Sequence, residues 1–435
     1  MYKANKKNED LLQKSQERLQ NEFIEATERG DMEAIKKVLD SGSLVPDITV
    51  MREGFEKSPL SLACIYGQTS VVEELLKNGA DPMRRSGTGR VPLHDACIGG
   101  NSECMSLLLD YMSDVDVADH NKQTALHHAA YNGEIKCLRL LTQKGANLVA
   151  EDSKGRQAAH LAAMHNHVKI LQLLFDHGVD LDCQCQAGKT PLHYAAQHGA
   201  LESLICLVEH DCDTTVSDNN TFLAAHQAAR YDKVDCLRFL VQQGTELDAA
   251  LSDGRTLAHV AAQYGATNAL HWLLEKGADA NAQDKLGNTP AHCAADRGKA
   301  DCFNCCLQHD GDLSLMNISR DSPLDAAKKS GHPQLIARAL KNETVCMQCF
   351  KKMKVAKWDE EHSPAQVERG IIAARSSAYI SPLPPARHSQ QTQLQKNLFR
   401  TKMKKETKTR LPERDLPAKY FGEYLDPNKN FKFSG

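Results

Sequence analysis

Histidine and cysteine residues lie close together at several points of this chain, as metal-binding and catalytic residues often do. In the segment TALHHAAYNGEIKCLRLL, residues 124–141, the neighbouring His127 and His128 are followed by Cys137. Neutral imidazole and thiolate groups are the usual ligands of zinc, and a histidine beside a cysteine can also activate the thiol as a nucleophile. The spacing of such residues along the whole chain decides between this chemistry and a structural role.

A repeat of 33 residues places the histidines. Seven of them are separated by that step: His94, His127, His160, His193, His226, His259 and His292. The same step reaches Ser61 on one side and Asp325 on the other, so the chain holds nine registers of one pattern. A period of this length is typical of proteins built from stacked supersecondary units.

Each register repeats one sequence frame, as in VPLHDACIGG, TALHHAAYNG and TPLHYAAQHG. These segments resemble the ankyrin repeat, whose TPLHxAAxxG signature and 33-residue period they match over about residues 22–340. The resemblance implies an all-α solenoid of stacked helix pairs. The AHxAA variants are also similar to the espin group of ankyrin proteins, although no actin-binding motif of that group is recognisable here.

The residues of the frame explain how each unit forms. A threonine such as Thr190 can cap the first helix of the pair, and Gly199 can take the left-handed conformation that ends it. A second helix, with apolar residues at helical spacing, follows. Because one pair cannot bury its apolar face alone, we expect residues 21–340 to stack into a solenoid, with 21–42 and 322–341 as its end caps.

Two kinds of departure interrupt the frame. Asn166 and Asp232 stand where other repeats have the helix-ending glycine, and Gln157 and Leu223 replace the capping threonine. The 33-residue step continues through these repeats, which we expect to be locally less stable.

The period indicates that the histidines and most cysteines are structural. Stacked helices lie about 8 to 10 Å apart, so equivalent histidines of successive repeats are too distant to share a metal with bonds of about 2 Å. By resemblance, His127, His193 and His292 tie the threonine three residues before them to the next repeat. Cys137 belongs to a column that other repeats fill with valine, isoleucine or alanine, which indicates a core position.

Two cysteine groups need a separate interpretation. The group CFNCC, residues 302–306, falls in core columns, so packing explains it. Cys346 and Cys349 lie beyond the repeats, where His362 could supply a third ligand but no fourth is evident. Zinc binding and an inert capping extension therefore both stay open for this second group.

Other catalytic signatures are absent from the sequence, since it contains no Walker loop, no HExxH and no GxSxG. We therefore predict that the protein is not an enzyme and has no catalytic, cofactor-binding or metal-binding residues.

Recognition is expected at the columns that the repeat leaves free. In ankyrin proteins the turn tips and first helices form a concave groove, and by resemblance these columns face it. The predicted groove residues are Lys57, Ile65, Tyr66, Arg90, Ile98, Tyr131, Arg156, Met164, His165, Lys189, Tyr231, Arg255 and Tyr264. Because basic columns lie beside apolar and aromatic ones, we predict a partner segment with acidic and aliphatic residues, bound mainly over residues 65–165. The alternative is that these are ordinary, half-covered residues of the groove with no partner.

The last 95 residues differ in charge. Residues 341–435 hold 19 Lys and Arg against 10 Asp and Glu, a net charge of +9, whereas the rest of the chain holds 34 against 46, a net charge of −12. We expect residues 1–20 to form a polar helical extension, 341–380 a capping or docking extension and 381–435 a disordered tail. The predicted binding residues of the tail are Lys402, Lys404, Lys405, Phe421, Tyr424, Phe431 and Phe433.

A basic tail with aromatic residues suits an acidic surface such as a cytoskeletal filament, RNA or anionic lipid, and a solvated tail or targeting signal is the alternative. We favour a filament or other acidic protein surface over nucleic acid.

The composition is that of an ordinary globular protein, with 41% hydrophobic residues and a formal charge of −3. No apolar run is long enough for a signal peptide or a membrane helix, and we read the fifteen cysteines as thiols. We therefore expect a monomer that is not secreted. We place it in the cytoplasm, with the cytoskeleton or the nucleus as alternative locations. The predicted function is a non-catalytic adaptor or scaffold; the alternative is a structural protein of the cytoskeleton or cilium, anchored by its tail.

Overall fold

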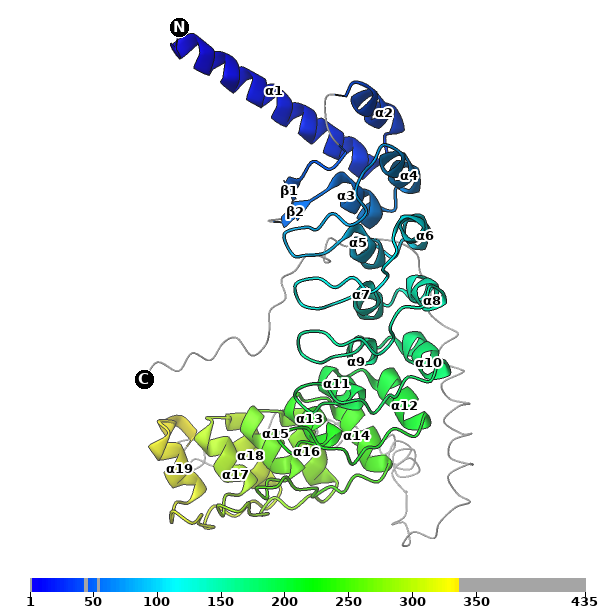
Figure 1. The fold of residues 1–435 in the computed structure, drawn as a ribbon. Coiled ribbons are helices and arrows are strands. Elements are labelled where there is room, and N and C mark those ends of the chain that lie inside the picture. Colours follow the sequence, from blue (N-terminus) through cyan, green and yellow to red (C-terminus); the bar gives the residue numbers. More distant parts are fainter. Residues whose placement is uncertain (1, 43–45, 53–54, 336–435) are drawn as a thin grey trace, which may run out of the picture. The chain divides into compact units, whose positions relative to one another are not determined.

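The computed structural model describes residues 2–42, 46–52 and 55–335, and within them it contains nineteen helices and one pair of strands (Figure 1). The helices are α1 (Tyr2–Arg29), α2 (Met32–Asp40), α3 (Pro59–Tyr66), α4 (Thr69–Lys77), α5 (Pro92–Ile98), α6 (Ser102–Tyr111), α7 (Ala125–Asn132), α8 (Ile135–Gln143), α9 (Ala158–Met164), α10 (Val168–Asp176), α11 (Pro191–His198), α12 (Leu201–Glu209), α13 (Ala224–Arg230), α14 (Val234–Gln242), α15 (Leu257–Tyr264), α16 (Thr267–Glu275), α17 (Pro290–Asp296), α18 (Ala300–Gln308) and α19 (Pro323–Lys329). The strands are β1 (Val50–Arg52) and β2 (Phe55–Lys57).

Successive helix pairs stack along the chain. From α3 onward the odd-numbered helices are the first helices of the predicted pairs, and the even-numbered helices are the second. Each first helix packs on its own partner and on the next first helix, as α7 does on α8 and α9 (Figure 1). The nine predicted registers correspond to the nine odd-numbered helices from α3 to α19, so the all-α solenoid is confirmed over the described residues.

The ends of the first helices follow the sequence frame. In α11, Thr190 is extended (φ −88°, ψ 167°) immediately before the helix, and Pro191 occupies its first turn. Gly199 ends the helix in the left-handed region (φ 76°) while its N–H bonds to the carbonyl of Ala195. Short helices of this kind are stable only because their neighbours bury them.

The core between the stacked helices is mostly aliphatic. Paired alanines such as Ala129 and Ala130 are completely buried and allow close helix contact. Thirteen cysteines of the described residues are free thiols, and eleven of them are buried. Cys137 and its equivalents ten residues after each anchor lie in this core, as their column predicts.

The first helix is longer than the repeat requires. α1 runs without interruption through the boundary expected between residues 20 and 21, and its last turns bury Phe23 and Ile24 against the following helices. The division of the chain into an extension, a repeat array and a tail stays a prediction, because residues 341–380 and 381–435 lie outside the described residues. No described helix has the length and apolar character that a membrane span requires.

The strand pair was not anticipated from the sequence. Its antiparallel register pairs Val50 with Lys57 and Arg52 with Phe55, in the turn that leads into α3. Equivalent turns elsewhere are held by single bridges, Ala118 with Thr124 and Ala250 with Thr256. Three of the described turns are thus short hairpins, and the one before α3 forms a ladder of three pairs.

Candidate functional site

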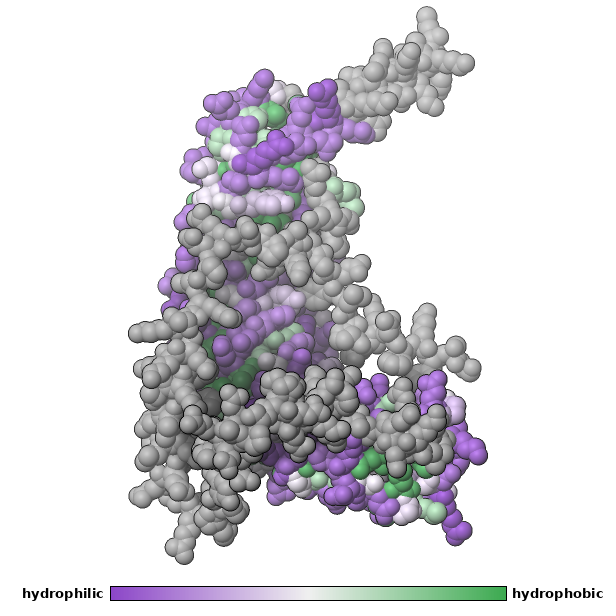
Figure 2. All heavy atoms as spheres, turned by 180° about the vertical axis from the view of Figure 1, so that it is seen from behind, coloured by the Kyte–Doolittle hydropathy of each residue, from purple (hydrophilic) through white to green (hydrophobic). Residues whose placement is uncertain are grey.

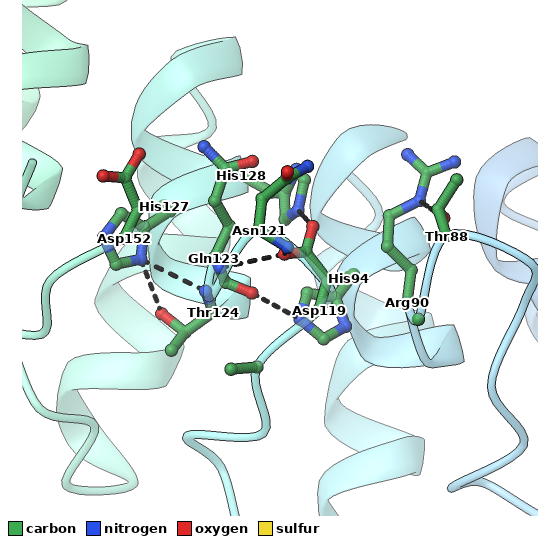
Figure 3. A network of polar contacts seen from close by, with 12 residues as sticks. Thr88, Arg90, His94, Asp119, Asn121, Gln123, Thr124, His127, His128 and Asp152 are labelled. Carbon is green, nitrogen blue, oxygen red and sulfur yellow. Dashed lines mark hydrogen bonds and ion pairs between the residues drawn. The ribbon is translucent and has the colours of Figure 1, made fainter. Parts of the chain in front are cut away.

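The repeated histidines link each repeat to the next. In all seven, Nδ1 accepts a hydrogen bond from the backbone N–H three residues earlier, and Nε2 donates to a carbonyl of the following turn. For His127 these distances are 3.1 Å to Thr124 and 3.0 Å to Arg156, and the Thr124 hydroxyl lies 3.0 Å from Nδ1 (Figure 3). His193 and His292 do the same, which confirms the role implied by the resemblance.

This geometry requires a neutral imidazole with its proton on Nε2. Burial lowers the pKa of all seven histidines, to about 3 for His94 and to about 4 for His160 and His226. Both ring nitrogens are engaged, so the repeated histidines stabilise the stack and do not transfer protons at neutral pH.

A second repeated residue, which the sequence analysis missed, closes the turns. Asp119, Asp152, Asp218 and Asp284 each stand five residues before the residue that caps the first helix. In each, Oδ1 accepts the backbone N–H groups two and four residues later, as Asp119 does from Asn121 (2.8 Å) and Gln123 (2.9 Å) (Figure 3). Their own 33-residue spacing, broken at Cys185 and Leu251, was the signal that could have identified them.

The second carboxylate oxygen of these aspartates binds side chains of the candidate groove. Oδ2 of Asp119 lies 3.3 Å from Nε2 of His128, and Oδ2 of Asp152 lies 2.7 Å from the guanidinium of Arg156. His128 therefore has a partner within its own repeat. The histidine pair that suggests chemistry in the sequence is divided between two structural hydrogen-bond networks (Figure 3).

The basic residues predicted for the groove are also engaged within the chain. Their partners are Asp95 for Arg90 (3.8 Å), Asp152 for Arg156, Gln197 for Lys189 (2.8 Å), and Asp253 (2.7 Å) with Gln263 (2.6 Å) for Arg255. The charges of the three arginines are offset by a carboxylate of their own repeat, whereas Lys189 is bonded to a neutral amide. The arginines therefore offer little free positive charge to an acidic ligand.

Lys57 differs from the other basic residues because it is buried, with only 4% of its surface exposed. Asp95, on the first helix of the next repeat, is also buried, and Arg90 lies 3.8 Å from its Oδ1. Burial raises the pKa of Asp95, while the positive charge of Arg90 opposes that shift. Lys57 thus lies beneath the predicted contact surface.

The apolar and aromatic residues predicted for the groove are more accessible. Tyr66 and Tyr264 are 49% and 40% exposed. Half-buried positions are occupied by Ile65, Ile98, Tyr131, Met164, His165 and Tyr231. The rings of Tyr131 and His165, from neighbouring repeats, lie 4.1 Å apart between centroids.

Arg230, which was not among the predicted residues, joins two of the tyrosines. Its guanidinium lies 4.2 Å from the ring centroid of Tyr264 and 5.4 Å from that of Tyr231. These are distances at which a cation is attracted to an aromatic face. The cluster of Arg230, Tyr231 and Tyr264 spans α13 and α15 and presents one arginine between two tyrosines.

A hollow of about 590 Å³ lies over α15, α17 and α19, and its lining includes Gln263, which precedes Tyr264 in the chain. Its charged lining consists of Asp253, Asp284, Asp296, Asp321, Arg255, Lys285 and Lys329. Lys329 is paired with Asp321 at 2.6 Å, as Arg255 is with Asp253. The lining thus holds four carboxylates against three cations, and the hollow lies C-terminal to residues 65–165, where the sequence placed the centre of the groove.

The face of the described residues drawn in Figure 2 is mostly hydrophilic, with small hydrophobic patches between polar side chains. The predicted tail residues from Lys402 to Phe433, together with Cys346, Cys349 and His362, lie outside the described residues.

Comparison with known proteins agrees with the stacked helix pairs. A family model described as "Ankyrin repeats (3 copies)" matches residues 23–119, 60–152, 111–185, 159–251, 212–284 and 258–348. Among solved structures, the human ASB11 ankyrin repeat domain is similar, with 24% sequence identity and a TM-score of 0.45, over 50% of this chain and 98% of that domain. No curated protein matches the chain.

Proposed function

Because this chain belongs to the ankyrin-repeat family, whose members generally bind other proteins, we propose that it is a non-catalytic adaptor or scaffold. It binds a protein partner on the groove side of its first helices. The basic tail, residues 341–435, contacts a second, acidic partner. The observation that carries the groove proposal is the cluster of Arg230, Tyr231 and Tyr264.

The cluster has the character of a binding surface because the fold does not require it. In the two columns that supply it, other repeats have residues as different as Gly99, Asn132 and Asp296. Tyrosine and arginine are the residue types most often found at the energetic centre of protein interfaces. An arginine already held between two rings loses little further side-chain freedom on binding.

The chemistry of the partner follows from the charges around the cluster. The three groove arginines lie beside aspartates of their own repeats, and the hollow over α15, α17 and α19 is lined by four carboxylates against three cations. This supports a partner segment with apolar or aromatic side chains and a hydrogen-bond donor or basic group. The acidic segment expected from the sequence is less favoured, because it would have to displace aspartates from their arginines.

Proximity labelling with the full-length chain tests the groove proposal. The double substitution Tyr231→Ala and Tyr264→Ala should remove the partners of the groove while circular dichroism stays unchanged, because both side chains lie outside the core. Phe175→Ala is the matched control, since Phe175 is a 42% exposed aromatic residue on the second helix α10. An unchanged set of labelled proteins for the double variant would contradict the proposal.

A chain ended at residue 345 distinguishes the adaptor from a structural protein of the cytoskeleton or cilium. Partners bound through the groove should be retained by the shortened chain, and partners of the basic tail should be lost. If filament proteins account for nearly all labelled partners and disappear together on truncation, attachment through the tail is the main function instead.

A further inference from the structure

A cluster of histidine and cysteine side chains lies between the last two complete helix pairs. His271 of α16, Cys305 of α18 and His309, which follows α18, each bring a ligand atom within 4.8 Å of the other two. We propose that these three residues bind a zinc ion. This site departs from the sequence expectation of no metal and from the packing role given to residues 302–306.

The distances suit zinc. Nδ1 of His271 lies 3.8 Å from Sγ of Cys305. With Zn–N bonds of about 2.0 to 2.1 Å and a Zn–S bond of about 2.3 Å, a tetrahedral site requires about 3.3 Å between two nitrogens and about 3.6 Å between nitrogen and sulfur, so the thiol and the imidazole need to approach by about 0.2 Å. The rings of His271 and His309 lie 5.4 Å apart between centroids, edge to face, and their ligand nitrogens, within 4.8 Å of each other, must approach to about 3.3 Å when the metal binds.

A carboxylate lies beside the first histidine. Glu275 lies one helical turn after His271, and its Oε1 is 3.1 Å from Nε2 of that ring, within ion-pair distance but not aligned for a hydrogen bond. A metal bound at Nδ1 would place the imidazole proton on Nε2, next to this carboxylate. The far nitrogen of a metal-bound histidine usually donates to a carboxylate, a backbone carbonyl or water.

The proposed zinc site is buried on one side and accessible to a metal ion on the other. His271 and Cys305 are buried, with 7% and 0% of their surface exposed, so they form the inner side of the site. His309 is partly exposed, but its Nε2 is a buried atom without a hydrogen-bond partner among the described residues. A metal could enter beside this ring, which lies at a helix end and not within a helix.

The repeat does not require a histidine at position 271 or a cysteine at position 305. The column of His271 is exposed in most other repeats, where it contains Ser106, Arg139, Gln172 and Arg238. The column of Cys305 contains larger apolar residues in most repeats, Leu107, Leu140, Leu173, Phe239 and Trp272, and a second cysteine, Cys206. At the cluster, a buried histidine in a mostly exposed column thus faces a small thiol in a mostly bulky column.

The ligand types select the metal. Two imidazoles and one thiolate suit zinc or another borderline-soft cation, whereas calcium and magnesium prefer oxygen ligands. Three protein ligands leave the fourth position for a water molecule.

The test uses the full-length chain with Cys346→Ser and Cys349→Ser, which removes the second cysteine pair. Titration with Co²⁺, a spectroscopic substitute for zinc, should show thiolate-to-cobalt charge transfer with one ion bound per chain. Cys305→Ala should abolish that absorption and His309→Ala should weaken binding at least tenfold. Glu275→Gln should lower the affinity by about 10- to 100-fold.

Cys302→Ala is the matched control, because Cys302 is a buried thiol one turn earlier on α18, next to Thr267 at 3.6 Å. It should leave cobalt binding unchanged. Zn²⁺ should also raise the melting temperature of the parent chain but not that of His309→Ala. The proposal is overturned if Cys305→Ala and His309→Ala, with unchanged circular dichroism, bind cobalt like the parent.

Discussion

His193 illustrates how a single side chain joins two repeats. Its Nδ1 accepts the N–H of Thr190 at 3.2 Å, and its Nε2 donates to the carbonyl of Phe222, 29 residues later, at 2.9 Å. The 33-residue period predicted a structural role for this histidine, and the resemblance to ankyrin repeats implied its link to the next repeat. The ion pair of Arg156 with Asp152 could not be predicted from the sequence. A column of basic residues shows where positive charge lies, but it does not show that the turn places a carboxylate beside it.

The substitution His193→Ala should lower the free energy of unfolding by about 2 to 4 kcal/mol, because it leaves a buried N–H and a buried carbonyl without partners. Urea denaturation measures this change. His120→Ala, at an exposed turn position, should change it by less than about 0.5 kcal/mol. Equal losses for the two variants would show that the histidine links contribute nothing specific.

Stability should also depend on pH through these histidines. Their folded pKa values are lowered below the unfolded value of about 6.5, to about 4 for His160 and His226. Between these values the unfolded chain binds more protons than the folded chain, so stability is complete above pH 6.5 and falls as the pH is lowered toward 4.

The slope should approach about 1.4 kcal/mol per pH unit for each histidine that stays neutral in the fold and is protonated on unfolding. Thermal melts between pH 7.5 and 4.5 measure it, and His160→Gln should reduce it. A melting temperature that does not change over this range would contradict the buried, neutral state of the histidines.

At the level of elements, Asp232 and Asn166 show how helix ends without glycine are compensated. Both adopt the left-handed conformation, with φ of 57° and 61°. Their side chains reach the next repeat: Asp232 accepts the N–H of Ala269 at 2.7 Å, and Asn166 accepts that of Ser203 at 2.9 Å. The sequence predicted locally weaker repeats, because the missing glycine is visible in the sequence whereas a hydrogen bond 37 residues away is not.

Substitutions at Asp232 separate the contribution of its hydrogen bond to Ala269 from the cost of its left-handed backbone conformation. Asp232→Ala should lower the free energy of unfolding by about 2 to 4 kcal/mol, because it loses a charged cap of α16 and keeps the strained conformation. Asp232→Gly should recover only about 1 kcal/mol of that loss. Chemical denaturation compares the two variants, and a glycine variant as stable as the wild type would show that the cap is unimportant.

At the scale of the whole molecule, the fold follows from the period, but the recognition surface does not. The clusters of Arg230 with Tyr264 and of His271 with Cys305 each join residues 34 positions apart, one repeat plus one residue. A search of the columns at that offset would have brought both pairs together. When each column of the repeat is examined alone, two residues that stacking brings into contact fall in different columns, and their proximity is missed.

Hydrogen–deuterium exchange of the full-length chain, with and without a partner captured by the groove, tests which face binds. Binding should protect amides of the first helices α13 and α15 and of the turns before them, at residues 214–231 and 247–264. The second helices α14 and α16 should exchange at unchanged rates. Protection confined to α14 and α16, or to residues 341–435, would contradict recognition through the groove.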